Sequence, residues 1–106
     1  MALDPKQLLV DLRRGLEKLY GSRLRELWLF GSYARGEQDE DSDVDVLVVL
    51  PEIVHYGTEV ERTSALASDL CLAHGPSVSL VFVPEHEWVQ LDSPFLRSVR
   101  TEAVAA

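Results

Sequence analysis

The spacing of apolar residues predicts an amphipathic helix at the start of the chain. Leucines recur every three or four residues from Leu8 onward, which places them on one face of a helix. Asp4 can cap this helix, and Pro5 suits its first position. Gly21 follows the last apolar residues and is a typical helix stop. We therefore expect a helix between Pro5 and Gly21.

Three largely apolar stretches predict buried strands. The first strand is expected over about residues 24–30, with the apolar run 27–30. The second is expected over 43–50, with the apolar run 46–50, and the third over 78–83. Pro51 and Pro84 directly follow the second and third runs, and proline cannot donate a hydrogen bond to a strand ladder. These prolines therefore set the ends of the two strands.

The segments between the strands predict further helices. We expect helices over about residues 32–36, 59–74 and 85–91, and a last helix that opens at Ser93-Pro94 and extends to about Val104. The side chains expected to face inward from the two longer helices are Thr63, Leu66, Ala67, Leu70, Ala73, Phe95, Leu96, Val99 and Ala103. Helices that alternate with strands fit a small α/β sheet backed by helices. A chain of 106 residues without repeats or linkers is expected to form one domain over residues 1–106.

The turn after the first strand suits the binding of a phosphate group. Gly31 follows the apolar run and lacks a Cβ, so the backbone can turn sharply there and approach a ligand closely. The residues after it can begin a helix, whose free N–H groups and partial positive charge attract an anion. The Ser32 hydroxyl can donate a hydrogen bond to a phosphate oxygen. The alternative is an ordinary strand–turn–helix junction in which Ser32 only caps the helix.

Two aspartates at the start of the second strand suit the binding of a divalent cation. Asp43 and Asp45 are two residues apart, so their side chains point to one face of a strand, while Val44 and Val46 point to the other. Neighbouring carboxylates repel each other, and Mg²⁺ is commonly held by one or two carboxylates together with substrate phosphates. The alternative is a solvated strand end that continues the acidic stretch 37–41.

The combined motif resembles the signature of a known superfamily. Gly-Ser-x-Ala-Arg-Gly begins at Gly31, and after five residues Ser-Asp-x-Asp ends at Asp45. This pattern resembles the DNA polymerase β-like nucleotidyltransferases, and among them the minimal nucleotidyltransferases that are often encoded beside a HEPN-domain partner. The resemblance implies the nucleotidyltransferase fold, which is α/β with α+β character and has a small mixed β-sheet backed by helices. It also implies nucleotide binding by Gly31 and Ser32, and catalytic, magnesium-binding roles for Asp43 and Asp45.

The resemblance implies an activity as well as a fold. It predicts Mg²⁺-dependent transfer of a nucleoside monophosphate, AMP from ATP, to a hydroxyl group. The acceptor is expected on a HEPN-type partner protein, which would make this chain the antitoxin of a toxin–antitoxin pair. Arg35 is a further candidate for nucleotide binding through a phosphate, although it could equally bond to a nearby carboxylate or a loop carbonyl. The alternative function is a catalytically weak or inactive module that neutralises a partner by masking its surface.

The chain departs from the superfamily pattern at one position. Members usually carry a third carboxylate on a neighbouring strand, where it helps to bind metal and can activate the acceptor hydroxyl. The third apolar run contains no acid, and Ser79 stands at about the expected place. Serine is a poor metal ligand and a poor base beside aspartate. Glu85 and Glu87 lie just beyond the strand and could substitute.

Size and charge restrict the partners that the chain can have. Nothing remains to build a separate domain for the acceptor, so the acceptor surface is expected from another chain, either a second copy in a homo-oligomer or a partner. Acidic residues outnumber basic residues 18 to 10, which gives a formal net charge of −8. Such a surface repels the phosphate backbone of nucleic acids and favours a basic partner protein.

Three further features bear on where the protein acts. The sequence has no apolar run of about 18 residues, so no membrane-spanning segment is expected. It shows no charged and then apolar N-terminal leader. Its one cysteine, Cys71, fits a reducing compartment. Together these features favour the cytoplasm.

Overall fold

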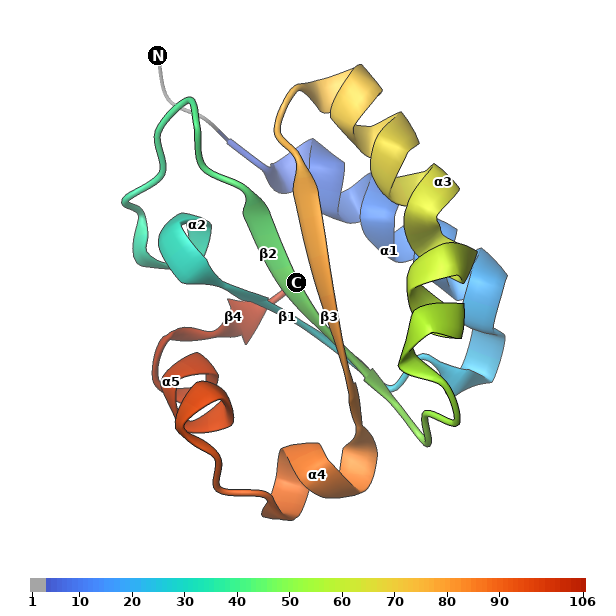
Figure 1. Ribbon diagram of the computed structural model, residues 1–106. Coiled ribbons are helices and arrows are strands. Elements are labelled where there is room, and N and C mark those ends of the chain that lie inside the picture. Colours follow the sequence, from blue (N-terminus) through green and yellow to red (C-terminus); the bar gives the residue numbers. More distant parts are fainter. Residues whose placement is uncertain (1–3) are drawn as a thin grey trace.

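The structure, a computed structural model, describes residues 4–106 as one mixed sheet with helices on both faces (Figure 1). The elements in chain order are α1 (Lys6–Tyr20), the 3₁₀ turn η1 (Gly21–Arg23), β1 (Glu26–Phe30), α2 (Gly31–Arg35), β2 (Val44–Leu50), α3 (Tyr56–His74), β3 (Val78–Pro84), α4 (Glu85–Gln90), α5 (Pro94–Glu102) and β4 (Val104–Ala105). The strand order is β3-β2-β1-β4. β2 is parallel to β3, whereas β1 is antiparallel to both β2 and β4. The predicted fold class is therefore confirmed.

β2 is the centre of the fold. It lies between β1 and β3, and its residues from Val46 to Leu50 are completely buried. Because successive side chains of a strand point to opposite faces, Val46 and Val48 pack toward α1 and α3, whereas Leu47 and Val49 pack toward α4 and α5. Figure 1 shows these two helix pairs on opposite faces of the sheet. A strand that is covered on both faces has a continuous apolar sequence, which is why the apolar run from Val46 to Leu50 predicted it.

α1 begins and ends close to its predicted bounds. The Lys6 N–H donates a hydrogen bond to the Asp4 carboxylate over 3.0 Å, and Pro5 is the N-cap residue. The helix therefore begins one residue later than predicted. Gly21 follows its last residue with a φ of +57°. Three leucines of the stripe, Leu8, Leu12 and Leu16, are buried in the core, whereas Leu19, which the same spacing placed on that face, is 40% exposed.

The C-terminal segment differs from the prediction. α5 ends at Glu102, and the next residues form the short strand β4, in which Val104 is opposite Leu29 and Ala105 is opposite Trp28. The free edge of β1 thus takes residues that the sequence assigned to the end of a helix. A strand of two residues is too short to show a periodic pattern, so local sequence could not reveal it.

Two side chains predicted to face inward are exposed. Ala73 lies on the solvent side of α3. The Phe95 ring is 46% exposed, although it contacts Phe30 edge to face at a centroid separation of 5.8 Å. α3 begins at Tyr56, before the predicted start at about residue 59, whereas α5 begins at Pro94 after the cap Ser93, as predicted.

The sheet places the candidate site at one end of β1 and β2. β1 leads directly into α2 there, and β2 begins beside it after the connecting loop. Within residues 4–106, no helix combines the length and the apolar character needed to cross a bilayer.

Candidate active site

Gly31 joins the end of β1 to the start of α2. Its φ of +75° lies in the left-handed region, which favours glycine. A Cβ on residue 31 would lie 2.2 Å from Asp45 Oδ2, far inside the normal contact distance. The position therefore requires glycine for two separate reasons. The sharp turn predicted at Gly31 brings the loop backbone directly against the Asp45 carboxylate.

Asp45 is the second residue of β2 and lies between the two neighbouring strands. It is opposite Phe30 of β1 and Ser79 of β3. Burial raises the pKa of the Asp45 carboxyl above its usual value, and the carboxylates of Asp43 and Glu102 raise it further. A nearby arginine offsets only part of this effect. The charged form of Asp45 is thus unfavourable unless a cation compensates it.

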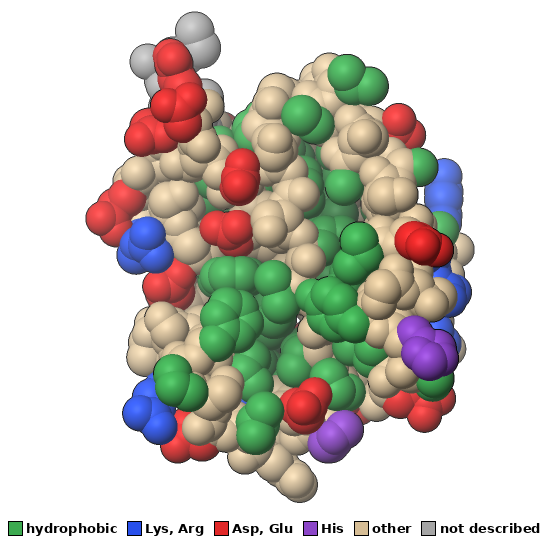
Figure 2. Space-filling view, in the orientation of Figure 1, with side chains coloured by type: hydrophobic (Ala, Val, Ile, Leu, Met, Phe, Trp, Pro, Cys, Tyr) green, Lys and Arg blue, Asp and Glu red, His purple; other side chains and the backbone are tan. Residues whose placement is uncertain are grey.

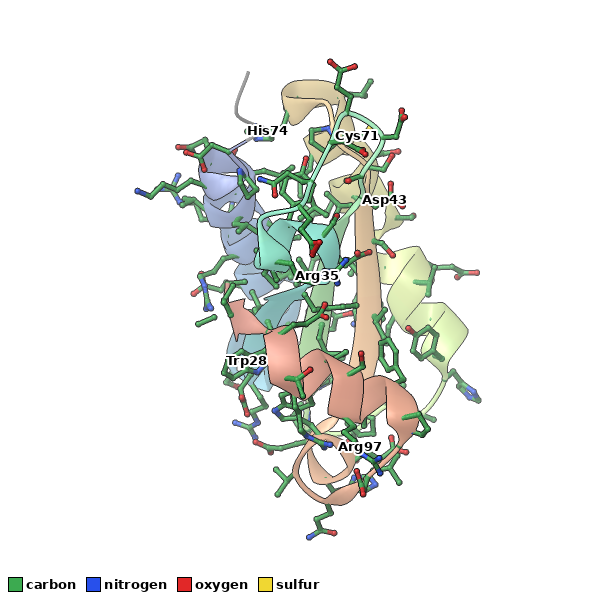
Figure 3. The ribbon with its side chains drawn as sticks, turned by 90° about the vertical axis from the view of Figure 1, so that its left-hand side faces the viewer. Trp28, Arg35, Asp43, Cys71, His74 and Arg97 are labelled. Atoms are coloured by element: carbon green, nitrogen blue, oxygen red, sulfur yellow. The ribbon has the colours of Figure 1, made fainter. Side chains whose placement is uncertain are left out.

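Asp43 lies at the end of the loop that leads into β2. Figure 3 shows it beside the start of the strand, at the same end of the sheet as Arg35. Short hydrogen-bonded turns shape the loop: the Asp39 N–H donates to Ser42 Oγ over 3.0 Å, and the Asp41 N–H donates to Asp39 Oδ1 over 2.9 Å. Acidic side chains gather around α2 and this loop, as Figure 2 shows. The structure thus brings the Asp43 carboxylate near enough to Asp45 to raise the pKa of the Asp45 carboxyl.

Ser32 is the second residue of α2 and does not cap the helix. The N-cap residue is Phe30, and no side chain makes a hydrogen bond at that cap. The alternative interpretation of Ser32 as an ordinary N-cap is therefore wrong. The Ser32 carbonyl accepts a hydrogen bond from the Glu37 N–H over 2.9 Å, which closes the short helix around the left-handed Gly36.

Arg35 bonds to carboxylates at the end of α2. Its Nε donates to Glu37 over 2.7 Å, and its Nη1 donates to both carboxylate oxygens of Glu102 at 3.1 Å. These bonds raise the pKa of the Arg35 guanidinium, with the Glu37 bond the larger cause. The sequence left open whether Arg35 bonds to a phosphate, a carboxylate or a loop carbonyl, and in the structure it bonds to carboxylates.

Glu102 is the site residue that sequence reasoning missed. It lies at the end of α5, and one of its carboxylate oxygens accepts a hydrogen bond from the Gly31 N–H. Its side chain is 19% exposed, although glutamate is rarely buried without partners. Glu102 is 71 residues from Gly31 along the chain, and no spacing rule connects the two.

The carboxylates fit a magnesium ion that substrate phosphates help to hold. In the described part of the chain, no three His, Cys, Asp or Glu side chains gather closely enough to hold a metal ion by themselves. Asp43 and Asp45 repel each other, and a cation would relieve the charge that raises the pKa of Asp45. Mg²⁺ typically binds to one or two carboxylates and completes its shell with phosphate oxygens and water. The donor set therefore fits Mg²⁺ that arrives with a nucleotide.

Ser79, which the family resemblance puts at about the place of a third carboxylate, is in β3. It is directly opposite Asp45 in the ladder between β2 and β3. The suggestion that Glu85 or Glu87 could substitute is wrong. Both are in α4, which follows the far end of β3, and Glu85 there pairs with Arg25 at 3.8 Å. Five strand residues, Leu80 to Pro84, at about 3.3 Å each separate Ser79 from Glu85.

Comparisons with known proteins agree with this geometry. Residues 9–103 match the nucleotidyltransferase domain family. The protein adenylyltransferase MntA of Thermococcus cleftensis is 46% identical over 48 residues, which cover 45% of this chain and 46% of that protein. The chain spans about half the length of the curated relatives it matches.

Solved structures are similar over nearly the whole chain. A candidate minimal nucleotidyltransferase matches with a TM-score of 0.62 and 26% identity, covering 100% of this chain and 97% of the other. The complex of the tri-AMPylated HEPN toxin of Shewanella oneidensis with its MNT antitoxin also contains a similar chain. That match has a TM-score of 0.52 and 22% identity, and covers 92% of this chain and 70% of the other. Because the identity of the second match is only 22%, that match shows a similar fold and no more.

Proposed function

The chain belongs to the nucleotidyltransferase domain family, and on that basis we propose that it transfers AMP from ATP to a hydroxyl group on a partner protein. The observation that carries the proposal is the contact between the backbone of Gly31 and the carboxylate of Asp45. This contact joins a phosphate-binding turn to a metal-binding carboxylate within one small site.

Each residue of the site has a role in the proposed reaction. Gly31 and Ser32 bind the triphosphate through the loop backbone and the serine hydroxyl. Arg35 binds a phosphate oxygen with its guanidinium. Asp43 and Asp45 hold Mg²⁺, which when bound neutralises phosphate charge and polarises the α-phosphate. Orientation of the triphosphate by these groups aligns the leaving group with the incoming hydroxyl.

The bonds that form and break follow from this arrangement. The acceptor oxygen forms a bond to the α-phosphorus, and the bond from that phosphorus to the bridging oxygen of pyrophosphate breaks. Pyrophosphate leaves with the electron pair, and the acceptor proton passes to solvent. No carboxylate stands at Ser79 to take that proton, so we expect turnover to be slow.

We propose a HEPN-type toxin as the acceptor, with this chain as its antitoxin. The similar fold in the complex of an AMPylated HEPN toxin with an MNT antitoxin supports this choice. The name protein adenylyltransferase, which the Thermococcus cleftensis relative carries, supports a protein acceptor and ATP as the donor. The net charge of −8 favours a partner with a basic surface.

Label transfer tests the proposed activity. The purified chain, a lysate of the source cell and Mg²⁺ are incubated with ATP labelled at either the α- or the γ-phosphate. Compared with lysate that lacks the purified chain, the proposal predicts additional α-label on a protein but no additional γ-label, and a chelator should prevent the addition. Additional γ-label on protein that depends on the purified chain would instead indicate phosphoryl transfer and contradict the proposal.

Variants of the aspartates locate the activity in this site. Asp43→Asn and Asp45→Asn should each lower transfer by at least about 100-fold because each removes a metal-binding carboxylate. Asp41→Asn is the matched control: it removes the same charge from the exposed loop and should transfer label at the normal rate. Normal transfer by both site variants would rule out the assigned metal site.

A second candidate function is a module that neutralises its partner by masking. The serine opposite Asp45 favours it, because this is the position at which a catalytic carboxylate is expected. A masking protein should neutralise its toxin equally well after both Asp43 and Asp45 are replaced by asparagine. An enzyme should lose neutralisation together with label transfer.

A further inference from the structure

The carboxylate of Glu102 occupies the groups to which we assign phosphate binding. Oε2 accepts a hydrogen bond from the Gly31 N–H, and both oxygens accept from Arg35 Nη1 at 3.1 Å. The Gly31 amide and the Arg35 guanidinium thus form a clamp on one anion. Figure 3 labels Arg35. Part of the chain's own C-terminal segment supplies that anion.

The fold holds Glu102 firmly against the clamp. Leu96 and Val99, on the same helix, are buried against β2 and β3. Directly after Glu102, β4 pairs with the free edge of β1, where Val104 lies opposite Leu29. The residue is therefore fastened on both sides, by helix packing before it and by strand pairing after it.

A phosphate and Glu102 cannot use the clamp together. The Gly31 N–H has a single hydrogen to donate, and a phosphate oxygen can accept it only when Glu102 does not. A phosphate and the Glu102 carboxylate are both negatively charged and would also repel each other if both lay beside the clamp. Glu37, the other partner of Arg35, bonds to Nε and makes no bond to Gly31, so it leaves the clamp free.

We propose that Glu102 is an internal competitor for the nucleotide phosphates, so that ATP binds only when this side chain leaves Gly31 and Arg35. Because the role presupposes the proposed nucleotide site, it concerns regulation of that site. The apparent affinity for ATP is then lowered by the fraction of molecules in which Glu102 occupies the clamp. A partner that displaces the α5–β4 segment would open the site and raise the affinity.

Calorimetric titration with ATP and Mg²⁺ tests the competition. Glu102→Ala removes the competing anion and should tighten ATP binding about tenfold or more relative to the unchanged protein. Pyrophosphate should gain by a similar factor, because the competition concerns phosphate oxygens alone. Glu102→Gln keeps the size of the side chain but not its charge and should give an intermediate gain.

Glu37→Gln is the matched control variant. It removes the same charge from the same arginine but makes no contact with Gly31, so its ATP affinity should change less than about threefold. Glu102 variants that bind ATP no more tightly than Glu37→Gln would overturn the competitor role while leaving the nucleotide site intact. Absence of ATP binding in every chain would overturn both the site and the competition.

A measurement on the unchanged protein covers the case in which a Glu102 variant does not fold. In ¹⁵N-labelled protein, pyrophosphate should shift the amide resonances of both Gly31 and Glu102, because the phosphate takes the place of the carboxylate. Shifts at Gly31 with an unchanged Glu102 resonance would contradict displacement.

Discussion

Gly31 and Asp45 are so close that a Cβ on residue 31 would lie 2.2 Å from Asp45 Oδ2. The two residues are 14 positions apart and belong to different elements: Gly31 begins α2, whereas Asp45 is in β2, opposite Phe30 at the end of β1. Glycine at position 31 thus permits the left-handed turn and also leaves room for the Asp45 carboxylate. A side chain at this position would displace the group that we assign to metal binding.

Gly31→Ala should therefore affect activity more than stability. The left-handed backbone should cost alanine about 1–2 kcal/mol in the free energy of unfolding. Displacement of Asp45 by as little as about 1 Å should lower transfer by about 100-fold. Chemical denaturation and the α-label assay measure these two effects.

Gly36→Ala separates the two effects. Gly36 ends the same helix with a φ of +71°, almost equal to the +75° of Gly31, but a Cβ there would meet nothing within 4 Å. The variant should lose similar stability and keep most of its activity. Equal losses of activity in both variants would mean that backbone strain, rather than contact with Asp45, explains the effect.

Asp45→Asn should stabilise the metal-free protein at neutral pH. The pKa of Asp45 in the folded chain is raised above the ordinary value of 3.8, chiefly by burial. Between these two values the folded state binds more protons than the unfolded state, so the free energy of unfolding decreases as pH rises. Asparagine removes this penalty, which is present in full above the raised pKa and absent below about pH 3.8.

Thermal unfolding in the presence of a chelator measures this difference. The melting temperature of Asp45→Asn should exceed that of the unchanged protein at about pH 7, and the two should converge as pH falls through the raised pKa. Asp41→Asn, which removes an exposed loop charge, should change the melting temperature little at either pH. A lower melting temperature for Asp45→Asn at neutral pH would show that the charged carboxylate stabilises the fold.

The parts of the site that depend on local sequence could be predicted. A strand buried on both faces produces the continuous apolar run of β2, and a left-handed turn beside a carboxylate requires the glycine at position 31. Ser79 was expected beside the site only from the family resemblance, and in the ladder between β2 and β3 it lies opposite Asp45.

The parts that depend on distant contacts could not be predicted. Glu102 reaches Gly31 only because β4 adds two residues to the edge of β1, and so short a strand has no pattern of its own. The sequence instead assigned Val104 to the preceding helix. One of the two arginine partners was hidden for the same reason: Arg35 bonds to Glu37, which is two residues away, but also to Glu102, which is 67 residues away.

Tyr20→Phe should destabilise the protein by about 2 kcal/mol, because it removes a buried hydrogen bond to a carboxylate. The Tyr20 hydroxyl donates to Glu59 over 2.6 Å and joins α1 to α3, and both residues are buried. Arg62 remains 3.4 Å from Glu59 and limits the loss. Urea denaturation at neutral pH measures it; a change below about 0.5 kcal/mol would show that the bond contributes little.

The same variant should lose part of the alkaline sensitivity of the fold. Burial, followed by the bond to Glu59, raises the pKa of Tyr20 above its ordinary value of 10.0. Above that pH the unfolded chain releases the tyrosine proton more readily than the folded chain, so the free energy of unfolding of the unchanged protein falls. Phenylalanine has no such proton. The stability difference between the two proteins should narrow as pH rises above 10.0.

Ser79→Asp should accelerate transfer if the missing third carboxylate limits the rate. The new side chain would lie opposite Asp45 in the sheet, where a base can receive the acceptor proton, and a gain of about tenfold or more is expected in single-turnover label transfer. Three neighbouring carboxylates repel, so the metal-free variant should melt at a lower temperature, and Mg²⁺ should restore more of its stability than it adds to the unchanged protein. Ser79→Asn has nearly the same shape as Ser79→Asp without the charge and should show neither effect.

Two outcomes would contradict this account of the rate. If Ser79→Asp gains the Mg²⁺-dependent stabilisation but transfers label at an unchanged rate, removal of the acceptor proton is not the rate-limiting step. A chain without transfer before and after the change, but with full neutralisation of its partner, would favour masking over catalysis.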